Sequence, residues 1–219
     1  MTLIERWTAL LNVDGDAVEA VRSAGLDLIA RYDEPHRRYH SLQHLTEVLD
    51  MVDDLAAEAD DLDAVRLAAW FHDAVYESGV AYAAAGVSNE EASAQLAELV
   101  LTRLGEPAAR AAEVARLVRL TEHHSAEDGD RNAAVLFDAD LAILAAEPAR
   151  YEEYTQAVRE EYREISDELF RPGRAQILEA LLAAPALYRT PAAHARLESR
   201  ARANVTAELA DLLAAPETR

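Results

Sequence analysis

The stretch Leu67-Ala68-Ala69-Trp70-Phe71-His72-Asp73-Ala74-Val75-Tyr76 decides the fold of this chain. It is apolar on nearly every side, which predicts a central helix of a helical bundle, running from about Asp63 to a point between Tyr76 and Gly79. His72 and Asp73 are an ionisable pair where the pattern would otherwise place core residues. An unpaired buried charge costs several kcal/mol or is neutralised. The pair therefore needs partners, and a metal ion is the obvious one.

Helical periodicity continues along nearly the whole chain, so the predicted fold class is all-α. We expect helices at about residues 2–12, 16–33, 89–104, 107–122, 148–165, 174–183 and 192–213, a short one that includes 135–144, and one that begins after the N-cap Ser41. No repeat, linker or change in composition indicates a second domain. Residues 1–219 are predicted to form a single-domain helical bundle, with a metal-site core at about 36–145 and a C-terminal helical extension at about 148–216 packed on it.

The composition limits the partners and the location. The chain has 219 residues, and its 21 Lys and Arg against 41 Asp and Glu give a formal net charge of −20. Such a surface repels a nucleic-acid backbone, so no long nucleic acid is expected as a partner. Because cysteine is absent, only nitrogen and oxygen atoms can be metal ligands. We see neither a secretory signal nor an apolar run near the ~20 residues of a membrane span, which favours the cytoplasm and no membrane contact.

The candidate ligands of one metal ion are His44, His72, Asp73 and Asp140. Two imidazoles and two carboxylates form a mixed nitrogen and oxygen set, which suits a divalent first-row metal ion with water in the open positions. Open positions allow chemistry as well as binding.

Seven short motifs surround these residues: Tyr39–His44, Trp70–Tyr76, Asn89–Ala94, Thr121–His124, Asp138–Leu141, Arg159–Tyr162 and Ala201–Asn204. Together with the order of the ligands, they resemble an uncharacterised bacterial branch of the HD-domain superfamily of metal-dependent phosphohydrolases. The resemblance implies a helical HD-type domain, a divalent metal ion (Mn, Mg, Zn, Ni, Co or Fe) and hydrolysis of a phosphate ester or anhydride by metal-activated water. Fold analogy does not choose the substrate. With the acidic surface, a small phosphorylated metabolite or nucleotide fits best.

His40 competes with His44 as the first ligand. If a helix began before His40, the two rings would share a face and could bind one ion. Ser41 is a good N-cap, however, and places the start of the helix after His40. The family pattern, in which an aliphatic residue such as Val48 follows the first histidine by four positions, selects His44. His40 is expected outside the ligand set or near the substrate, with a second metal ion as the other role.

Asp138 and Asp140 point about 200° apart on a helix, so they cannot serve equally as ligands. Asp140, followed by Leu141, matches the last ligand of the family. Asp138 is expected to cap the short helix or to orient a histidine, with a second metal ion as its other role. The pair His123-His124 has two roles open to it: ligation of a second metal ion, or a hydrogen bond to phosphate or to the attacking water.

Other polar residues have candidate roles toward the substrate. Glu90 is expected to position water or act as general base, although the helix dipole also favours an acidic residue in a first turn. Glu91 is the second member of a capping box, which favours a structural role. Arg37 and Arg38 are candidates for binding phosphate, with a solvated loop as the other interpretation. The glycine-bracketed connection at 78–88 is a candidate lid.

These features favour an enzyme, with His72, Asp73 and Glu90 in catalytic roles. The alternative with the same fold is a dinuclear-iron oxygenase of the helical His-Asp type, which His123 and His124 would support. A third hypothesis is a non-catalytic binding module that keeps the metal ion as a structural element. The sequence does not set the oligomeric state, and a homodimer stays open.

Overall fold

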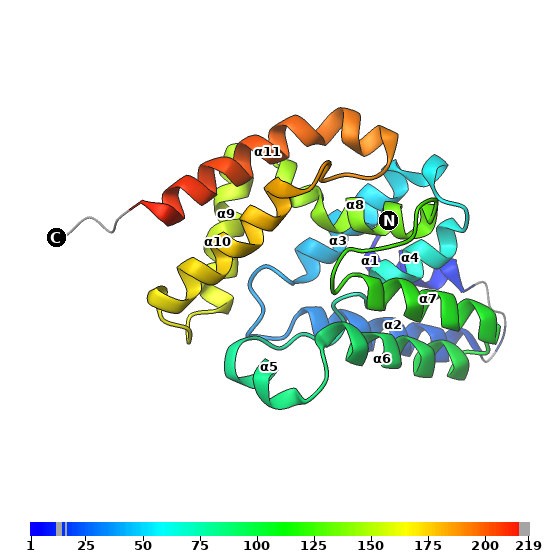
Figure 1. The fold of residues 1–219 in the computed structure, drawn as a ribbon. Helices are drawn as coiled ribbons and strands as arrows, with labels where there is room; N and C mark the ends of the chain where they lie inside the picture. Colours follow the sequence, from blue (N-terminus) through cyan, green and yellow to red (C-terminus); the bar gives the residue numbers. More distant parts are fainter. Residues whose placement is uncertain (12–14, 16, 215–219) are drawn as a thin grey trace.

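The computed structural model describes residues 1–11, 15 and 17–214, and over these residues the chain is helical with no strand. The elements are α1 (Leu3–Leu10), α2 (Ala17–Tyr32), α3 (Leu42–Asp54), η1 (Ala56–Glu58), α4 (Leu62–Phe71), α5 (Gly79–Ala85), α6 (Asn89–Arg103), α7 (Ala108–Leu120), α8 (Arg131–Asp140), η2 (Leu141–Ala145), α9 (Pro148–Glu161), α10 (Asp167–Ala183) and α11 (Pro191–Leu213). Figure 1 shows α9, α10 and α11 gathered on one side of the bundle. The all-α prediction is confirmed. The predicted boundaries at 12, 16 and 216 lie outside the described residues.

The central position predicted for α4 is confirmed. Residues Leu67–Phe71 are fully buried, and the helix packs against α1, α3, α6, α7 and α8. The carboxylate of Asp61 begins the helix by accepting the N–H of Ala64. Trp7 of α1 packs edge-on against Trp70, with 5.4 Å between the ring centroids. Each described helix is either too short or too polar to cross a bilayer.

The end of α4 differs from the prediction. The helix stops at Phe71, and His72 is its C-cap, so the helical pattern does not continue to Tyr76 or Gly79. The backbone beyond the helix bonds instead to side chains from other segments, which meet its need for partners without a helical ladder. Tyr32 accepts the N–H of Asp73, Arg37 donates to the carbonyls of Asp73 and Ala74, Ser93 bonds both backbone groups of Val75, and Asn89 bonds both of Glu77.

Residues 78–88 contain a short helix where the sequence predicts a loop. This helix, α5, lies at the periphery of the molecule in Figure 1. Gly79 and Gly86 bracket it with φ angles of +58° and +76°, a region that only glycine adopts without steric cost. The segment therefore has a glycine at each end of its helix, and its role as a lid stays a prediction.

The C-terminal extension is joined to the bundle mainly through α11, which packs against η2 and α10. Within the extension, Arg174 donates to Glu208 and to the hydroxyl of Tyr154, each at 2.7 Å. α10 begins at Asp167 and includes Pro172, where the sequence predicts a break. Pro172 is exposed, so water can bond the carbonyl that its missing N–H leaves free, and the helix continues.

Candidate metal centre

Three helices bring the four predicted ligands close together. His44 lies in the first turn of α3, His72 and Asp73 follow the last residue of α4, and Asp140 ends α8. The Nε2 atoms of the two histidines are 3.0 Å apart. Oδ2 of Asp73 lies 3.4 and 3.2 Å from the Nε2 atoms of His44 and His72. Oδ1 of Asp140 lies 3.3 and 3.7 Å from the same two atoms.

The spacing and chemistry of the donor atoms of His44, His72 and Asp140 fit a single metal ion. Ligands about 2.1 Å from an ion, at octahedral or tetrahedral angles, lie roughly 3.0 to 3.4 Å from their neighbours. Imidazole nitrogens with carboxylate oxygens suit first-row divalent ions. His44, His72 and Asp140 therefore form a cluster that could hold a metal ion. Oδ2 of Asp73 lies close to both histidines but outside this group of three, and its role as a fourth ligand stays a prediction.

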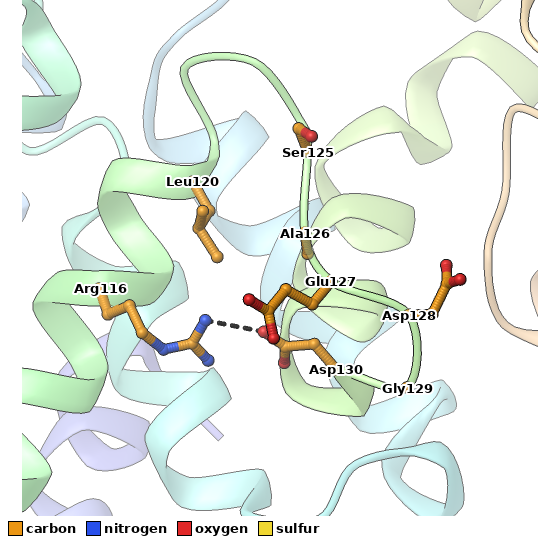
Figure 2. Close-up of a pocket in the computed structure, with 8 residues that line it drawn as sticks. All are labelled: Arg116, Leu120, Ser125, Ala126, Glu127, Asp128, Gly129 and Asp130. Carbon is orange, nitrogen blue, oxygen red and sulfur yellow. Dashed lines mark hydrogen bonds and ion pairs between the residues drawn. The ribbon is translucent and has the colours of Figure 1, made fainter.

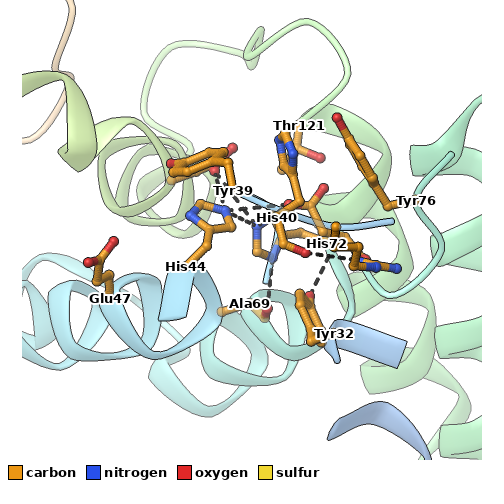
Figure 3. A network of polar contacts seen from close by, with 12 residues as sticks. Tyr32, Tyr39, His40, His44, Glu47, Ala69, His72, Tyr76 and Thr121 are labelled. Atoms are coloured by element: carbon orange, nitrogen blue, oxygen red, sulfur yellow. Dashed lines mark hydrogen bonds and ion pairs between the residues drawn. The ribbon is translucent and has the colours of Figure 1, made fainter. Parts of the chain in front are cut away.

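His72 is oriented by its own helix (Figure 3). Its Nδ1 lies 2.8 Å from the carbonyl oxygen of Ala69. A carbonyl can only accept, so Nδ1 carries the hydrogen and Nε2 presents its lone pair to the cluster. That carbonyl is one of those at the end of α4 that the helix leaves without an N–H partner. One hydrogen bond thus serves both the helix end and the site.

The two carboxylates give the cluster a preference for positive charge. Burial lowers the pKa of His44, but hydrogen bonds to Asp140 and Asp73 outweigh burial and raise the pKa to about 9. Burial raises the pKa of Asp140, but hydrogen bonds from His124 and His44 outweigh burial and hold the pKa well below its ordinary value. Without a cation the histidines would therefore keep protons between the carboxylates. A divalent ion offers the same carboxylates a positive charge and displaces those protons.

Arg37 holds the turn after α4. Its buried guanidinium donates to the carbonyls of Asp73 at 2.7 Å, His40 at 3.1 Å and Ala74 at 3.4 Å. Its Nε donates to Glu34 at 3.1 Å. The prediction that Arg37 binds a substrate phosphate does not fit, because its donors are buried and already used. Arg37 instead ties the segment before α3 to the turn that carries Asp73.

Glu90 and Arg38, both predicted to act toward the substrate, lie in different surroundings. Glu90 is half-buried in the first turn of α6, and burial together with the charge of Asp73 raises its pKa. A carboxyl group near the cluster with a raised pKa suits a role with water. Arg38 is exposed and donates to the carbonyls of Pro35 and Arg37. Within the described part of the chain, neither side chain hydrogen-bonds a residue of the cluster, and both roles stay predictions.

His40 lies beside the ligand set and is held there by Glu161. Nδ1 of His40 is 2.7 Å from Oε2 of Glu161, and Oε1 accepts the three backbone N–H groups of residues 38–40 at 2.7, 2.9 and 3.0 Å. The His40 ring stacks on Tyr76, with 4.0 Å between centroids and 23° between planes. The centroids of the His40 and His44 rings are 5.8 Å apart. Figure 3 shows these rings grouped around His72.

Glu161 is the residue of the site that the sequence reasoning missed. Arg159, which lies in the same sequence motif, binds Asp167 at 3.0 Å and not Glu161. A signal was present in the sequence, because the buried residues of α9 recur at helical spacing and Glu161 continues the series. The buried residues of this helix are Tyr151, Tyr154, Val158 and Glu161. An acidic residue at a core position needs hydrogen-bond partners, as His72 and Asp73 do.

Asp138 is structural, but it acts at a different place from the one predicted. It is fully buried, and its two oxygens accept the backbone N–H groups of Arg189 and Thr190, each at 2.7 Å. Thr190 is the N-cap of α11, so Asp138 supports the start of that C-terminal helix. The prediction that Asp138 caps the short helix or orients a histidine is therefore wrong. Asp140 points the other way, into the cluster.

His123 and His124 occupy different environments. Nε2 of His124 lies 2.9 Å from Oδ2 of Asp140, the oxygen that does not face His44. His124 has a φ of +46°, and its carbonyl accepts a hydrogen bond from Arg189 at 2.6 Å. His123 is exposed, and its Nδ1 lies 3.0 Å from the carbonyl of its own neighbour, Glu122. Of the pair, the fold brings only His124 to the ligand set.

A surface hollow of about 820 Å³ lies beside the segment that follows His124 (Figure 2). It is lined by Arg116, Leu120, Ser125, Ala126, Glu127, Asp128, Gly129 and Asp130. Arg116 is occupied by Asp130 at 2.7 Å and by Glu113 at 2.8 Å. None of the candidate ligands lines the hollow. Its acidic lining disfavours a phosphate group, and it is distinct from the metal cluster.

No family model, curated protein or solved structure matches the chain. Its function is therefore inferred from the residues of the cluster and their surroundings.

Proposed function

We propose that this chain is a metal-dependent hydrolase of phosphate esters or anhydrides. The main support is the cluster of His44, His72 and the two carboxylates, in which the histidine nitrogens lie 3.0 Å from each other and 3.2 to 3.7 Å from the carboxylate oxygens. These residues follow the order of the HD-domain superfamily that the motifs resemble. A site with at most four protein ligands also leaves coordination positions for water and substrate.

The residues in and around the cluster would have different roles in the reaction. The two histidines and two carboxylates hold the ion, for which Mn, Mg, Zn, Ni, Co and Fe all suit the donor set. A bound divalent ion would lower the pKa of water and neutralise charge on the phosphoryl group. Burial, and after it the charge of Asp73, raises the pKa of Glu90, which makes this residue a candidate to position that water or take its proton. Arg37 keeps Asp73 in place through its carbonyl.

The charge of the chain favours a small substrate. With a formal net charge of −20, the chain would repel a long phosphate backbone along most of its surface. A small phosphorylated metabolite or a nucleotide exposes few charges to that surface. The proposed substrate belongs to this class.

Turnover assays test the proposal. Protein stripped with a chelator is supplied with each divalent metal in turn and incubated with a panel of phosphorylated metabolites and nucleotides, and released phosphate is measured. We expect release that depends on the metal. His72→Ala and Asp140→Asn should lose metal and turnover together. His194→Ala is the matched control, because this exposed histidine on α11 pairs with Glu198. A metal-free His72→Ala/Asp73→Ala variant that keeps wild-type turnover would sink the proposal.

A dinuclear-iron oxygenase is the second candidate, and the position of His124 favours it. Its Nε2 lies 2.9 Å from Oδ2 of Asp140, so this carboxylate could bridge two ions with His124 on the second. Metal analysis of protein purified without added metal, with an optical spectrum, separates the candidates. Two irons per chain would favour the oxygenase, and one exchangeable divalent ion the hydrolase. Bound metal with no turnover on either class of substrate would favour a binding module.

A further inference from the structure

The two nitrogens of the His40 ring are used differently. Nδ1 bonds Oε2 of Glu161 at 2.7 Å. No described residue hydrogen-bonds Nε2. Among the described residues, Trp70 Nε1 is the only side-chain nitrogen or oxygen that is both buried and unpaired, so the unpaired Nε2 of His40 is open to solvent. A ring held at one nitrogen and open at the other can contact a ligand.

Glu161 fixes which of the two nitrogens carries the hydrogen. Its side chain has no exposed surface. Burial raises the pKa of Glu161, but the hydrogen bond and the charge of His40, together with the backbone N–H groups before α3, outweigh burial and lower the pKa to about 2. The ionised carboxylate can only accept hydrogen bonds. The neutral His40 ring must therefore carry its hydrogen on Nδ1 and present a lone pair at Nε2.

The His40 ring is also fixed in position next to the cluster. It stacks on Tyr76 at 4.0 Å and meets Tyr39 edge-on at 4.8 Å. The hydroxyl of Tyr76 donates to Oε2 of Glu161 at 3.3 Å, which joins the ring and the carboxylate into one network. The side chain of His40 keeps 21% of its surface exposed, whereas that of His44 keeps 2%. His40 is thus more accessible to a ligand than its neighbour His44.

We propose that His40 is a catalytic residue of this hydrolase: its Nε2 accepts a hydrogen bond from the attacking water and orients that water toward phosphorus. Glu161 is the positioning residue, because it holds the ring and sets its tautomer from α9. This inference rests on the proposed function. It gives His40 a role in the reaction that is separate from holding the ion, and it gives the C-terminal extension a part in the site.

Glu161→Gln tests the tautomer with little loss of structure. Glutamine keeps an oxygen that can accept the N–H groups of residues 38–40, but its amide nitrogen replaces the oxygen that faces Nδ1 of His40. Because the amide nitrogen donates, the ring must move its hydrogen to Nε2 and lose the lone pair there. Nitrogen-15 NMR of the labelled ring should show Nδ1–H in the wild type and Nε2–H in this variant. We expect kcat to fall by about 10- to 100-fold with little change in KM.

His40→Ala tests the contact with water directly and does not disturb Glu161 beyond one bond. We expect kcat to fall by about 100-fold while the metal content stays that of the wild type. Glu160→Gln is the control for Glu161→Gln, because Glu160 pairs with Arg163 on the surface. His194→Ala is the control for His40→Ala. Both controls should keep wild-type kcat and KM.

Several results would overturn this inference. One is wild-type turnover in His40→Ala. Another is loss of metal from that variant, which would make His40 a ligand. The third is a wild-type His40 ring that carries its hydrogen on Nε2. A wild type that hydrolyses no phosphorylated compound would overturn the proposed function and the catalytic role of His40 with it. The NMR measurement needs no substrate, so it tests the tautomer of His40 separately from turnover. It remains decisive even if Glu161→Gln folds poorly, because the wild-type ring must itself show Nδ1–H.

Discussion

Arg37 supports the metal cluster without being a ligand. Its guanidinium donates to the carbonyls of Asp73 and His40. Arg37→Met would leave these carbonyls without donors inside the protein, so we expect a loss of about 3 kcal/mol in the free energy of unfolding. Metal affinity should fall about 10-fold, because the turn that carries Asp73 loosens. Urea unfolding and metal titration measure the two effects.

The neighbouring Arg38 provides the matched control for Arg37. Arg38 is exposed, and its side chain bonds only nearby carbonyls in the described structure. Arg38→Ala should change the free energy of unfolding by less than about 0.5 kcal/mol. Equal losses in the two variants would contradict the role of Arg37.

Asp138 and Asp140 should separate stability from metal binding. Asp138 accepts two N–H groups at the start of α11, so Asp138→Ala should cost about 2 kcal/mol of unfolding free energy and leave metal binding in the folded protein unchanged. Asp140→Ala should abolish metal binding. Calorimetric metal titration beside denaturant unfolding compares the two variants. An Asp138→Ala protein that is fully stable but binds no metal would refute this division.

Among helices, α9 is anchored to the segment before α3 by the ionised Glu161. The pKa of Glu161 falls from 4.5 to about 2 on folding. A pKa that is lower in the folded state stabilises the protein above the unfolded value and ceases to do so as the pH falls through the folded value. The destabilisation of Glu161→Gln should therefore be greatest above about pH 4.5 and shrink toward about pH 2. Unfolding measured across this range would argue against the anchor if the difference stayed constant.

Helix positions could be predicted from the sequence more readily than helix ends. The apolar run through Trp70 predicts α4 because burial follows from local pattern. Its end at Phe71 depends on side chains such as Arg37 and Ser93, which reach the turn from distant segments. Pro172 shows the reverse error, since an exposed position tolerates a proline that would break a buried helix.

In the candidate site, the candidate ligands could be predicted from the sequence, but most of the residues that support them could not. His44, His72 and Asp140 could be selected only from their order and the motifs around them, since the 41 Asp and Glu and 7 His residues offer many other metal-binding atoms. Apart from Glu34, the partners of Arg37 are backbone carbonyls, which leave no trace in the sequence. The sequence does indicate that Glu161 is buried, because Glu161 continues the helical spacing of the core residues of α9. Its partners are mainly backbone N–H groups, however, and these cannot be recognised from the sequence.

For the whole molecule, a metal ion that binds only the folded state should raise stability. At a free metal concentration of 100 times Kd the gain is about 2.7 kcal/mol. Thermal unfolding of chelator-treated protein should therefore shift upward when a binding metal is added. His72→Ala should show no shift. An equal shift in both proteins would place the bound ion elsewhere on the acidic surface.

Two buried carboxylates reach in opposite directions between the metal-site core and the C-terminal extension. Glu161 lies in the extension and holds residues 38–40, whereas Asp138 lies in the core and holds the start of α11. A fragment that ends at Ala145 would contain every candidate ligand, yet it would leave the N–H groups of residues 38–40 without their acceptor and the buried Asp138 without its donors. The smallest unit that could be transplanted into another scaffold is therefore larger than the span of its ligands, and would have to include α9 and the first turn of α11.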